Sequence, residues 1–363
     1  MSTSAMPRRV LIGYFTRELM SRIALCVLIL VSLMEILALL EQTTTILERH
    51  LGVRGILLYA TLRLPLLLGT ALPLSTQVGA LLLLTAMTTS SEIAILRAAG
   101  LATPRLLALM LPATLVTGLF SAVLADQVTP RAELALAEWW NATTPDNQTP
   151  DGHAFWFRSG DTLVSVGSIG HAGRQAQRID LYQRDAAGML VSATHADSAD
   201  YTDGQWHLRR ARVVRLSPTH ADTVPPVDMP WQTTLSPRGL VRLSIDTPPL
   251  SLGTMLGSLY GRIPASQPPS AYRTAFLERL LLPLFFVVML SLALPVVYIP
   301  PRTGTRSMIP VYCLAAGLLF VLFQGVLRAL GNAGTLPALL AIAPGIGIFA
   351  LGVGTVLIRM EDR

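Results

Sequence analysis

Lysine is absent from this 363-residue sequence, so all 28 basic residues are arginine. A phosphate-binding P-loop needs a lysine against the β and γ phosphates, and Schiff-base catalysis needs a lysine amine. Neither chemistry can therefore be built from this chain alone. Charge is also scarce, because charged residues make up 14% of the chain against roughly 25% in soluble domains. With 52% hydrophobic residues, this composition indicates a membrane protein.

Residues for metal or nucleophilic chemistry are equally sparse. The two cysteines, Cys26 and Cys313, both lie in apolar runs, which argues against a disulfide framework or a zinc site. The six histidines show no ligand spacing such as His-Glu-x-x-His, and no Gly-x-Ser-x-Gly elbow occurs. The net charge of +6 is expected to mark cytoplasmic ends in a membrane chain. We therefore predict no catalytic residue, no metal site and no nucleic-acid partner.

Long apolar runs are what the sequence does contain. A helix needs about 20 mostly apolar residues to cross a bilayer, and six runs approach or exceed that length. They cover residues 20–40, 56–87, 106–124, 275–298, 308–327 and 336–358. The second run contains Pro65 and Pro73, which predict kinks. The first run is too long for a cleavable signal peptide and is expected to stay as an anchor.

The stretch between the third and fourth runs has the pattern of β-structure. Residues alternate at 154–157, 162–166 and 179–182, and the Asp203-Gly204 pair predicts a hairpin turn. A short helix is expected before it, over Glu133–Trp140. The predicted fold is a six-helix (3+3) membrane protein with an inserted all-β, jellyroll-like or sandwich-like domain. Its parts are residues 1–125, 126–272 and 273–363.

Orientation follows from the arginines that flank the runs. A cytoplasmic N-terminus places ten arginines inside and leaves three in the short outer loops, Arg49, Arg54 and Arg328, in agreement with the positive-inside rule. The ten are Arg8, Arg9, Arg17, Arg22, Arg97, Arg105, Arg302, Arg306, Arg359 and Arg363. Both termini are then cytoplasmic, and the β domain is periplasmic in a bacterial inner membrane.

The connection between the second and third runs predicts a short helix over about residues 89–100. Thr89 and Glu92 have capping-box spacing, Gly100 suits a left-handed C-terminal cap, and Pro104 prevents continuation. Its apolar residues, Ile93, Ile95 and Leu96, suggest a surface for a partner. An equally weighted alternative is that Glu92 only caps the helix and the apolar face lies on the membrane surface.

The residues of this region resemble a known family. The segment Leu72-Pro73-Leu74 through Gly79-Ala80-Leu81, followed by Ser91-Glu92-Ile93-Ala94-Ile95-Leu96-Arg97-Ala98-Ala99-Gly100, is similar to the signature of the LptF/LptG family of lipopolysaccharide export permeases. The resemblance extends over the whole six-span plan. It favours the LptG branch, because the segments Trp231–Pro237, Leu243–Asp246 and Leu250–Ser251 resemble that branch's exit from its β-jellyroll.

The resemblance implies a subunit of an ABC transporter, with no catalytic site of its own. The implied partners are an LptF-like paralogous permease, an LptB-like ATPase dimer and a periplasmic bridge of LptC-like and LptA-like proteins. The implied cargo is lipopolysaccharide. ATP and Mg would lie in the ATPase, and this chain would hold no cofactor. The implied ATPase-coupling residues are Glu92, Ile93, Leu96 and Arg97.

Charged residues within or near the runs are the remaining candidates, because charge at membrane depth is costly. Glu35 and Arg63 are predicted either to form an ion pair between two helices or, in the case of Arg63, to bind a lipid phosphate. Arg54 and Arg131 near the outer face are candidates for the same anion. The sequence departs from the family here, since Ala38, Leu39 and Gln42 occur where relatives often carry lysine.

Several features keep two interpretations. The strand residues Phe155, Phe157, Val164, Val166, Ile179 and Leu181 fit a lining for acyl chains, although a plain core is the simpler expectation for most of them. A stripe of small residues in the last run, Ala343, Gly347, Ala350 and Gly354, favours packing within the chain slightly over a partner interface.

Two other functions are weaker alternatives. A membrane sensor or scaffold with a periplasmic β domain normally adds a cytoplasmic signalling domain, and every cytoplasmic segment here is short. A mechanotransmission permease usually carries its large domain after the first span, whereas here it follows the third.

Overall fold

The computed structural model describes residues 8–143, 154–170, 173–185, 187–216, 221–233, 235–245, 251–261, 263–299 and 307–361. Within them, six helical segments are long and apolar enough to cross a membrane, which confirms the six predicted spans. Some residues used above lie outside the described ranges: Arg302, Arg306, Arg363, Thr234, Asp246 and Leu250.

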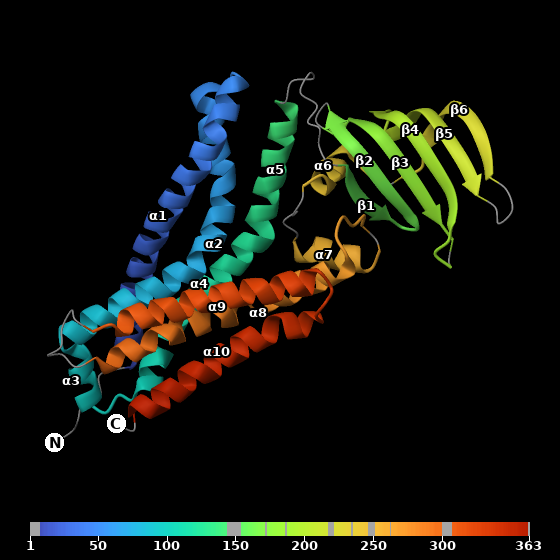
Figure 1. Ribbon diagram of the computed structural model, residues 1–363. Helices are drawn as coiled ribbons and strands as arrows, with labels where there is room; N and C mark the ends of the chain where they lie inside the picture. The colour runs from blue at the N-terminus through green and yellow to red at the C-terminus, as the bar shows by residue number, and fades with distance from the viewer. Residues whose placement is uncertain are drawn as a thin grey trace. The chain divides into compact units, whose positions relative to one another are not determined.

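The six spans contain most of the helical residues (Figure 1). Their helices are α1 (Arg8–Glu48), α2 (Gly52–Thr89), α4 (Thr103–Val123), α8 (Pro269–Ala293), α9 (Ile309–Asn332) and α10 (Ala338–Glu361). A π-helix, η1 (Leu124–Val128), joins α4 to α5 (Thr129–Ala142), and a 3-10 helix, η3 (Leu294–Tyr298), ends α8. The predicted helix at Glu133–Trp140 is thereby confirmed as part of α5. Pro65 and Pro73 lie inside α2, and the kinks predicted at them stay a prediction.

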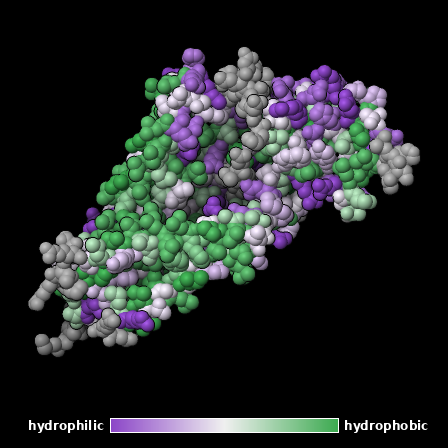
Figure 2. All heavy atoms as spheres, viewed as in Figure 1, coloured by the Kyte–Doolittle hydropathy of each residue, from purple (hydrophilic) through white to green (hydrophobic). Residues whose placement is uncertain are grey.

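The outer surfaces of the spans are apolar. Leu28, Leu322 and Leu351 are 65%, 67% and 73% exposed, which suits side chains that face lipid. In Figure 2 the visible surface of the long helices is mostly hydrophobic, whereas the visible surface of the sheet is largely hydrophilic. The hydropathy of the sequence is therefore distributed as a bilayer requires.

The chain divides into two compact units, which are described separately. The membrane unit consists of Met1–Glu41, Leu64–Asp126 and Arg273–Arg363. The β unit consists of Gln42–Arg63 and Gln127–Tyr272, so it includes the end of α1 and the start of α2.

Close helix approach in the membrane unit depends on small residues. A Cβ added to Gly79 of α2 would lie 3.0 Å from the backbone nitrogen of Ile23 in α1, so a side chain at this position would force the two helices slightly apart. The Gln77 side chain occupies the space beside Gly317 of α9 and donates a hydrogen bond to the carbonyl of Cys313 at 2.7 Å. The Gly79 of the family-like signature is thus explained by packing.

The small-residue stripe of α10 behaves differently from the expectation. No atom lies within 4 Å of a Cβ added to Gly347 or Gly354, so the prediction that the stripe packs within the chain is wrong at these two positions. Gly345, which does not belong to the stripe, instead accommodates the Gln324 side chain of α9. The hydrophobic period alone could not identify which small residues face the neighbouring helix.

The β unit contains one six-stranded antiparallel sheet with the sequential strand order of a meander (Figure 1). The strands are β1 (Phe155–Ser159), β2 (Thr162–Gly170), β3 (Gln175–Arg184), β4 (Leu190–Thr202), β5 (Gln205–Leu216) and β6 (Ala221–Trp231). Asp203 and Gly204 both have positive φ, at 52° and 80°, as a type I′ hairpin turn requires. The predicted inserted all-β domain and its hairpin are confirmed, with the described strands arranged as a single sheet and not as the two packed sheets of a sandwich.

One face of the sheet carries a closed core. Four of the candidate lining residues, Phe157, Val164, Val166 and Ile179, are fully buried there, together with Trp206, whose indole N–H donates to the Leu235 carbonyl at 2.8 Å. The helix α6 (Pro237–Leu243) covers this core with Leu240 and Leu243, and a further short helix, α7 (Leu252–Leu259), follows it. Phe155 and Leu181 are only partly buried. The simpler interpretation as a core is therefore correct for these four residues.

Candidate functional site

The connection between α2 and α4 contains the short helix α3 (Glu92–Ala98). Its seven residues give a length of about 10 Å, shorter than the predicted segment 89–100. The predicted capping box is wrong, because Thr89 is the last residue of α2 and its hydroxyl donates to the Ala86 carbonyl. Ser91 precedes α3 with a left-handed φ of 65° and makes no side-chain cap. A tight reversal therefore separates α2 from α3.

The C-terminal end of α3 is fixed by a Schellman motif. Gly100 has a φ of +85°, its N–H donates to the Arg97 carbonyl, and the N–H of Leu101 donates to the Leu96 carbonyl. A side chain at position 100 would strain this backbone. The predicted left-handed glycine cap is confirmed, and α4 begins three residues later with Thr103 and Pro104.

The two faces of α3 have different surroundings. Ile93 is 2% exposed and belongs to the main core of the membrane unit, against which Leu96 is partly buried. Ile95, on the opposite side, is 67% exposed. Ile93 and Leu96 therefore fasten α3 to the membrane unit, and Ile95 is the large apolar side chain that α3 leaves available to another molecule.

Glu92 is held at the start of α3 by two hydroxyl groups. Tyr14 of α1 donates to Oε2 at 3.3 Å, and Ser90 donates to Oε1 at 3.0 Å. Neither bond is made by an opposite charge, so the carboxylate keeps its negative charge available for a cationic partner group. Tyr14 was not identified from the sequence, because 78 residues separate it from Glu92.

Arg97 connects the end of α3 to η3. Its guanidinium carbon lies 4.7 Å from the centroid of the Tyr298 ring, a cation–π distance. The Tyr298 hydroxyl is in turn 2.7 Å from the Thr103 hydroxyl at the start of α4. Displacement of α3 is thus opposed by the contact of Glu92 to α1 at one end and by the contact of Arg97 to η3 at the other, and η3 is itself hydrogen-bonded to α4.

The candidate lipid-contact residues Arg54, Arg63 and Arg131 lie in the β unit. Arg63 is half-buried and donates to the Tyr59 hydroxyl one turn earlier on α2, and the Glu133 carboxylate of α5 lies within range of its charge. Arg131 is exposed and donates to the Gln127 side chain at 3.2 Å, and Arg54 is exposed at the start of α2. Among the residues that the structure describes, no contact joins these three arginines.

Further contacts of the β unit converge on α5. The Arg49 guanidinium lies 4.2 Å from the Trp140 ring centroid and donates to the Trp140 carbonyl, and burial lowers the pKa of Arg49. The Tyr59 ring contacts the same indole. On α6, Arg238 pairs with Glu138 of α5 at 3.2 Å. Helix α5 is therefore bound both to the ends of α1 and α2 and to the helix that covers the sheet.

Glu35 lies half-buried on α1 in the membrane unit. The predicted Glu35–Arg63 ion pair would join the two compact units, and it stays a prediction. Within the β unit, Arg63 already has Tyr59 and Glu133 as neighbours.

Comparison with known proteins identifies relatives along the whole chain. A family model described as "Lipopolysaccharide export system permease LptF/LptG" matches residues 13–359. The chain is 21% identical over 353 residues to the lipopolysaccharide export system permease protein LptG of Haemophilus influenzae, covering 96% of this chain and 98% of that protein. It is 20% identical over 352 residues to the protein of the same name from Escherichia coli, with the same coverage.

Proposed function

Because this chain belongs to the LptF/LptG family of lipopolysaccharide export permeases, we propose that it couples ATP hydrolysis in a separate ATPase to the extraction of lipopolysaccharide from the inner membrane. The chain is a multi-pass transport subunit without a catalytic domain. More specifically, α3 is the element on which the ATPase exerts force when it hydrolyses ATP. The observation that carries it is the division of α3 into a buried anchor, Ile93, and an exposed face with Ile95.

The chemistry of that face suits a protein partner. Glu92 presents a carboxylate held by neutral hydroxyls, Ile95 presents an exposed apolar side chain, and Arg97 is fixed over an aromatic ring. An apolar anchor beside a charged group is a common arrangement at protein interfaces. A basic groove on the ATPase would bind Glu92 with charge-assisted hydrogen bonds, while Ile93 and Leu96 transmit the load to the core.

The proposed partners follow from family membership and from the missing lysine. An LptB-like ATPase dimer would supply ATP and Mg, an LptF-like paralogue would complete the permease pair, and LptC-like and LptA-like proteins would receive the lipid from the β domain. Arginine counts in the connections support cytoplasmic termini, a cytoplasmic α3 and a periplasmic sheet in the inner membrane.

The lipid contacts are proposed at Glu35, Arg54, Arg63 and Arg131. Guanidinium groups bind phosphate with paired hydrogen bonds, and Arg54 and Arg131 are exposed enough to reach a lipid A phosphate. Arg63 would do so with its Tyr59 contact retained.

Co-purification tests the coupling proposal. The tagged chain should purify in detergent with a second six-span permease and a soluble P-loop ATPase. Glu92→Ala should weaken the ATPase association, whereas Glu92→Gln should weaken it less, because the amide oxygen still accepts one of the two hydroxyl hydrogen bonds and the amide nitrogen can donate to the other hydroxyl oxygen. The exposed Glu41→Ala change on α1 is the matched control. A chain that purifies alone, with envelope integrity unaffected by Glu92→Ala, would contradict the proposal and favour the sensor alternative.

Photocrosslinking tests the lipid proposal independently of the ATPase. A photoreactive amino acid at positions 35, 54, 63 and 131 should label lipopolysaccharide in growing cells. Labelling at none of them would remove these contacts and leave the role of α3 unaffected.

A further inference from the structure

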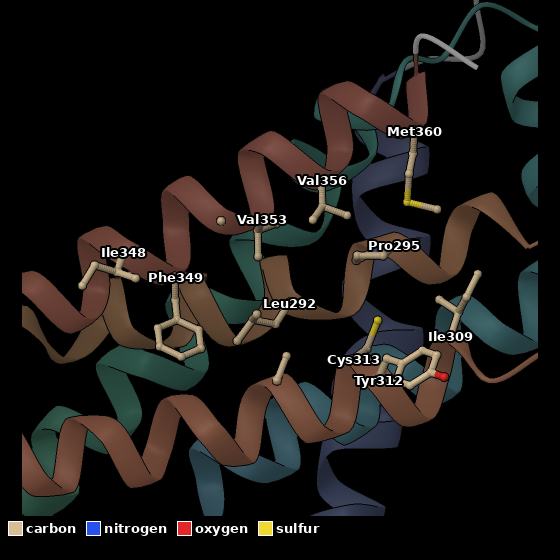
Figure 3. Close-up of a pocket in the computed structure, with 12 residues that line it drawn as sticks. Leu292, Pro295, Ile309, Tyr312, Cys313, Ile348, Phe349, Val353, Val356 and Met360 are labelled. Carbon is tan, nitrogen blue, oxygen red and sulfur yellow. The ribbon is translucent and has the colours of Figure 1, made fainter.

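An apolar groove of about 490 Å³ lies in the membrane unit between the end of α8, η3, α9 and α10 (Figure 3). Leu292 and Pro295 lie on one side of it, Cys313 lies on α9, and Phe349 and Val353 of α10 point into it. No charged side chain is among the twelve that line it, and Tyr312 carries the only hydroxyl group. A groove of this composition binds hydrocarbon.

The length of the groove matches one leaflet of a bilayer. Along α10 it extends from Ile348 to Met360, which corresponds to about 18 Å of helix. One leaflet contributes about 15 Å, half of the roughly 30 Å hydrocarbon core. The groove therefore begins at the end of α10 and reaches about the middle of the membrane, and a spanning helix would need twice that length.

The groove is narrow as well as short. A volume of about 490 Å³ over about 18 Å gives a mean cross-section of roughly 27 Å². A single extended hydrocarbon chain fits such a groove.

An arginine lies beside one end of the groove. Arg359 is exposed in the last turn of α10, directly before the lining residue Met360, and the exposed Tyr312 lies on α9 near the same end. A guanidinium and a phenol hydroxyl at the membrane boundary suit a phosphate group. At the other end, α9 and α10 are in close contact where the Gln324 amide donates to the Ile342 carbonyl at 3.4 Å.

We propose that this groove binds one acyl chain of an anionic phospholipid from the cytoplasmic leaflet, with the lipid phosphate at Arg359. The inference takes its orientation from the proposed function. The acyl chain fills the space where α9 and α10 separate, and it covers apolar side chains that would otherwise line a void. The lipid thereby holds the two helices at a fixed separation.

Two glycines of α10 allow a matched test of this site. Gly352 lines the groove and Gly347 does not, and no atom lies within 4 Å of a Cβ added to either. The complex is reconstituted in vesicles of phosphatidylglycerol that include a photoactivatable phosphatidylglycerol with a diazirine in one acyl chain. After illumination, mass spectrometry locates the lipid adducts. Adducts are expected on the groove segments 292–295, 313–316 and 348–356.

Gly352→Leu should reduce these adducts at least about tenfold, since displacing two buried methylenes already changes an equilibrium by that order. Gly347→Leu should leave them unchanged. Equal adduct yields in both variants, or adducts spread evenly over all lipid-facing helices, would overturn the site. Arg359→Gln should remove the preference for photoactivatable phosphatidylglycerol over phosphatidylcholine, and an unchanged preference would overturn the phosphate contact.

A measurement without any groove substitution guards against misfolding of Gly352→Leu. In a Cys26→Ala chain, the Cys313 thiol is the only cysteine, and its Sγ faces the groove (Figure 3). Its reaction with N-ethylmaleimide should be several-fold slower in vesicles of long-chain phosphatidylglycerol than in dioctanoyl-phosphatidylglycerol micelles. Equal rates would count against an acyl chain over Cys313.

Two further results would assign another occupant. Capture of a protein subunit by a photoreactive amino acid at position 352 would make the groove a helix-docking site. Displacement of the photoactivatable lipid by lipopolysaccharide would make it a cargo site. Failure of the proposed function is distinguishable, because ATPase association is expected to be unaffected by Gly352→Leu.

Discussion

Two isoleucines on α3 separate an anchoring role from a docking role, because they differ in burial and not in chemistry. Ile93 is 2% exposed and Ile95 is 67% exposed. Truncating the buried side chain in Ile93→Ala should destabilise the membrane unit by about 2–5 kcal/mol. Ile95→Ala should change stability by less than about 0.5 kcal/mol, because an exposed side chain makes few contacts.

For binding to the ATPase, the larger effect is expected from Ile95→Ala and the smaller one from Ile93→Ala. If the partner fully covers Ile95, removing three carbon atoms from it loses about 2 kcal/mol of apolar burial, or roughly thirtyfold in Kd. Ile93→Ala removes no group from the exposed face, so the Kd of the folded fraction should change little.

Stability is measured as the thermal midpoint at which the buried Cys26 thiol of a Cys313→Ala chain becomes reactive, and affinity by titrating the detergent-solubilised permease pair with the ATPase. An Ile95→Ala chain with unchanged affinity would refute the assignment of this face. The same conclusion would follow if Ile93→Ala lowered affinity without lowering the thermal midpoint.

Three other outcomes follow from individual contacts. Gly79→Val should destabilise the membrane unit by about 1–3 kcal/mol through overpacking against the α1 backbone and so lower the thermal midpoint. Gly69→Val on the same helix meets no atom within 4 Å of its Cβ and should leave the midpoint higher; equal midpoints would contradict the close crossing. Tyr298→Leu removes the ring beneath Arg97 and should raise the ATP hydrolysed per lipid released, whereas Tyr298→Phe keeps the ring and should raise it less. The same ratio of ATP hydrolysed to lipid released in the unmodified protein, Tyr298→Leu and Tyr298→Phe would exclude η3 from coupling. The pKa of Asp228 is lowered chiefly by the backbone N–H of Arg210 and, to a smaller extent, by the guanidinium of Arg209, which both donate hydrogen bonds to its carboxylate. The stabilising contribution of Asp228 is therefore present above about pH 4 and is lost as the pH falls through the lowered pKa. Asp228→Asn should therefore flatten the acid side of the unfolding profile of the β unit, and an unchanged profile would count against this linkage.

Much of the architecture could be predicted from local sequence. The six spans follow from runs of apolar residues long enough to cross a bilayer, and the hairpin at Asp203-Gly204 follows from a backbone that few other residue pairs adopt. Gly100 was predictable as a cap for the same reason. In each case the determining interactions are within a few residues of one another.

The arrangement around α3 depended on tertiary structure. A helix of seven residues is too short for its apolar period to show whether Ile93 or Ile95 faces the core. The capping-box prediction failed because α2 continues through Thr89, where the Ser90 N–H still donates to the Ala86 carbonyl at 2.9 Å.

The sequence by itself determined the membrane class, the six spans, the inserted β domain and the absence of lysine-dependent ATP chemistry, since each depends on composition or on short-range pattern. Only the tertiary structure decided that Tyr14 holds Glu92, that Tyr298 lies against Arg97, and that α9 and α10 leave a groove. These features join residues far apart in the chain. Their partners are selected by the packing of whole helices, which local sequence does not encode.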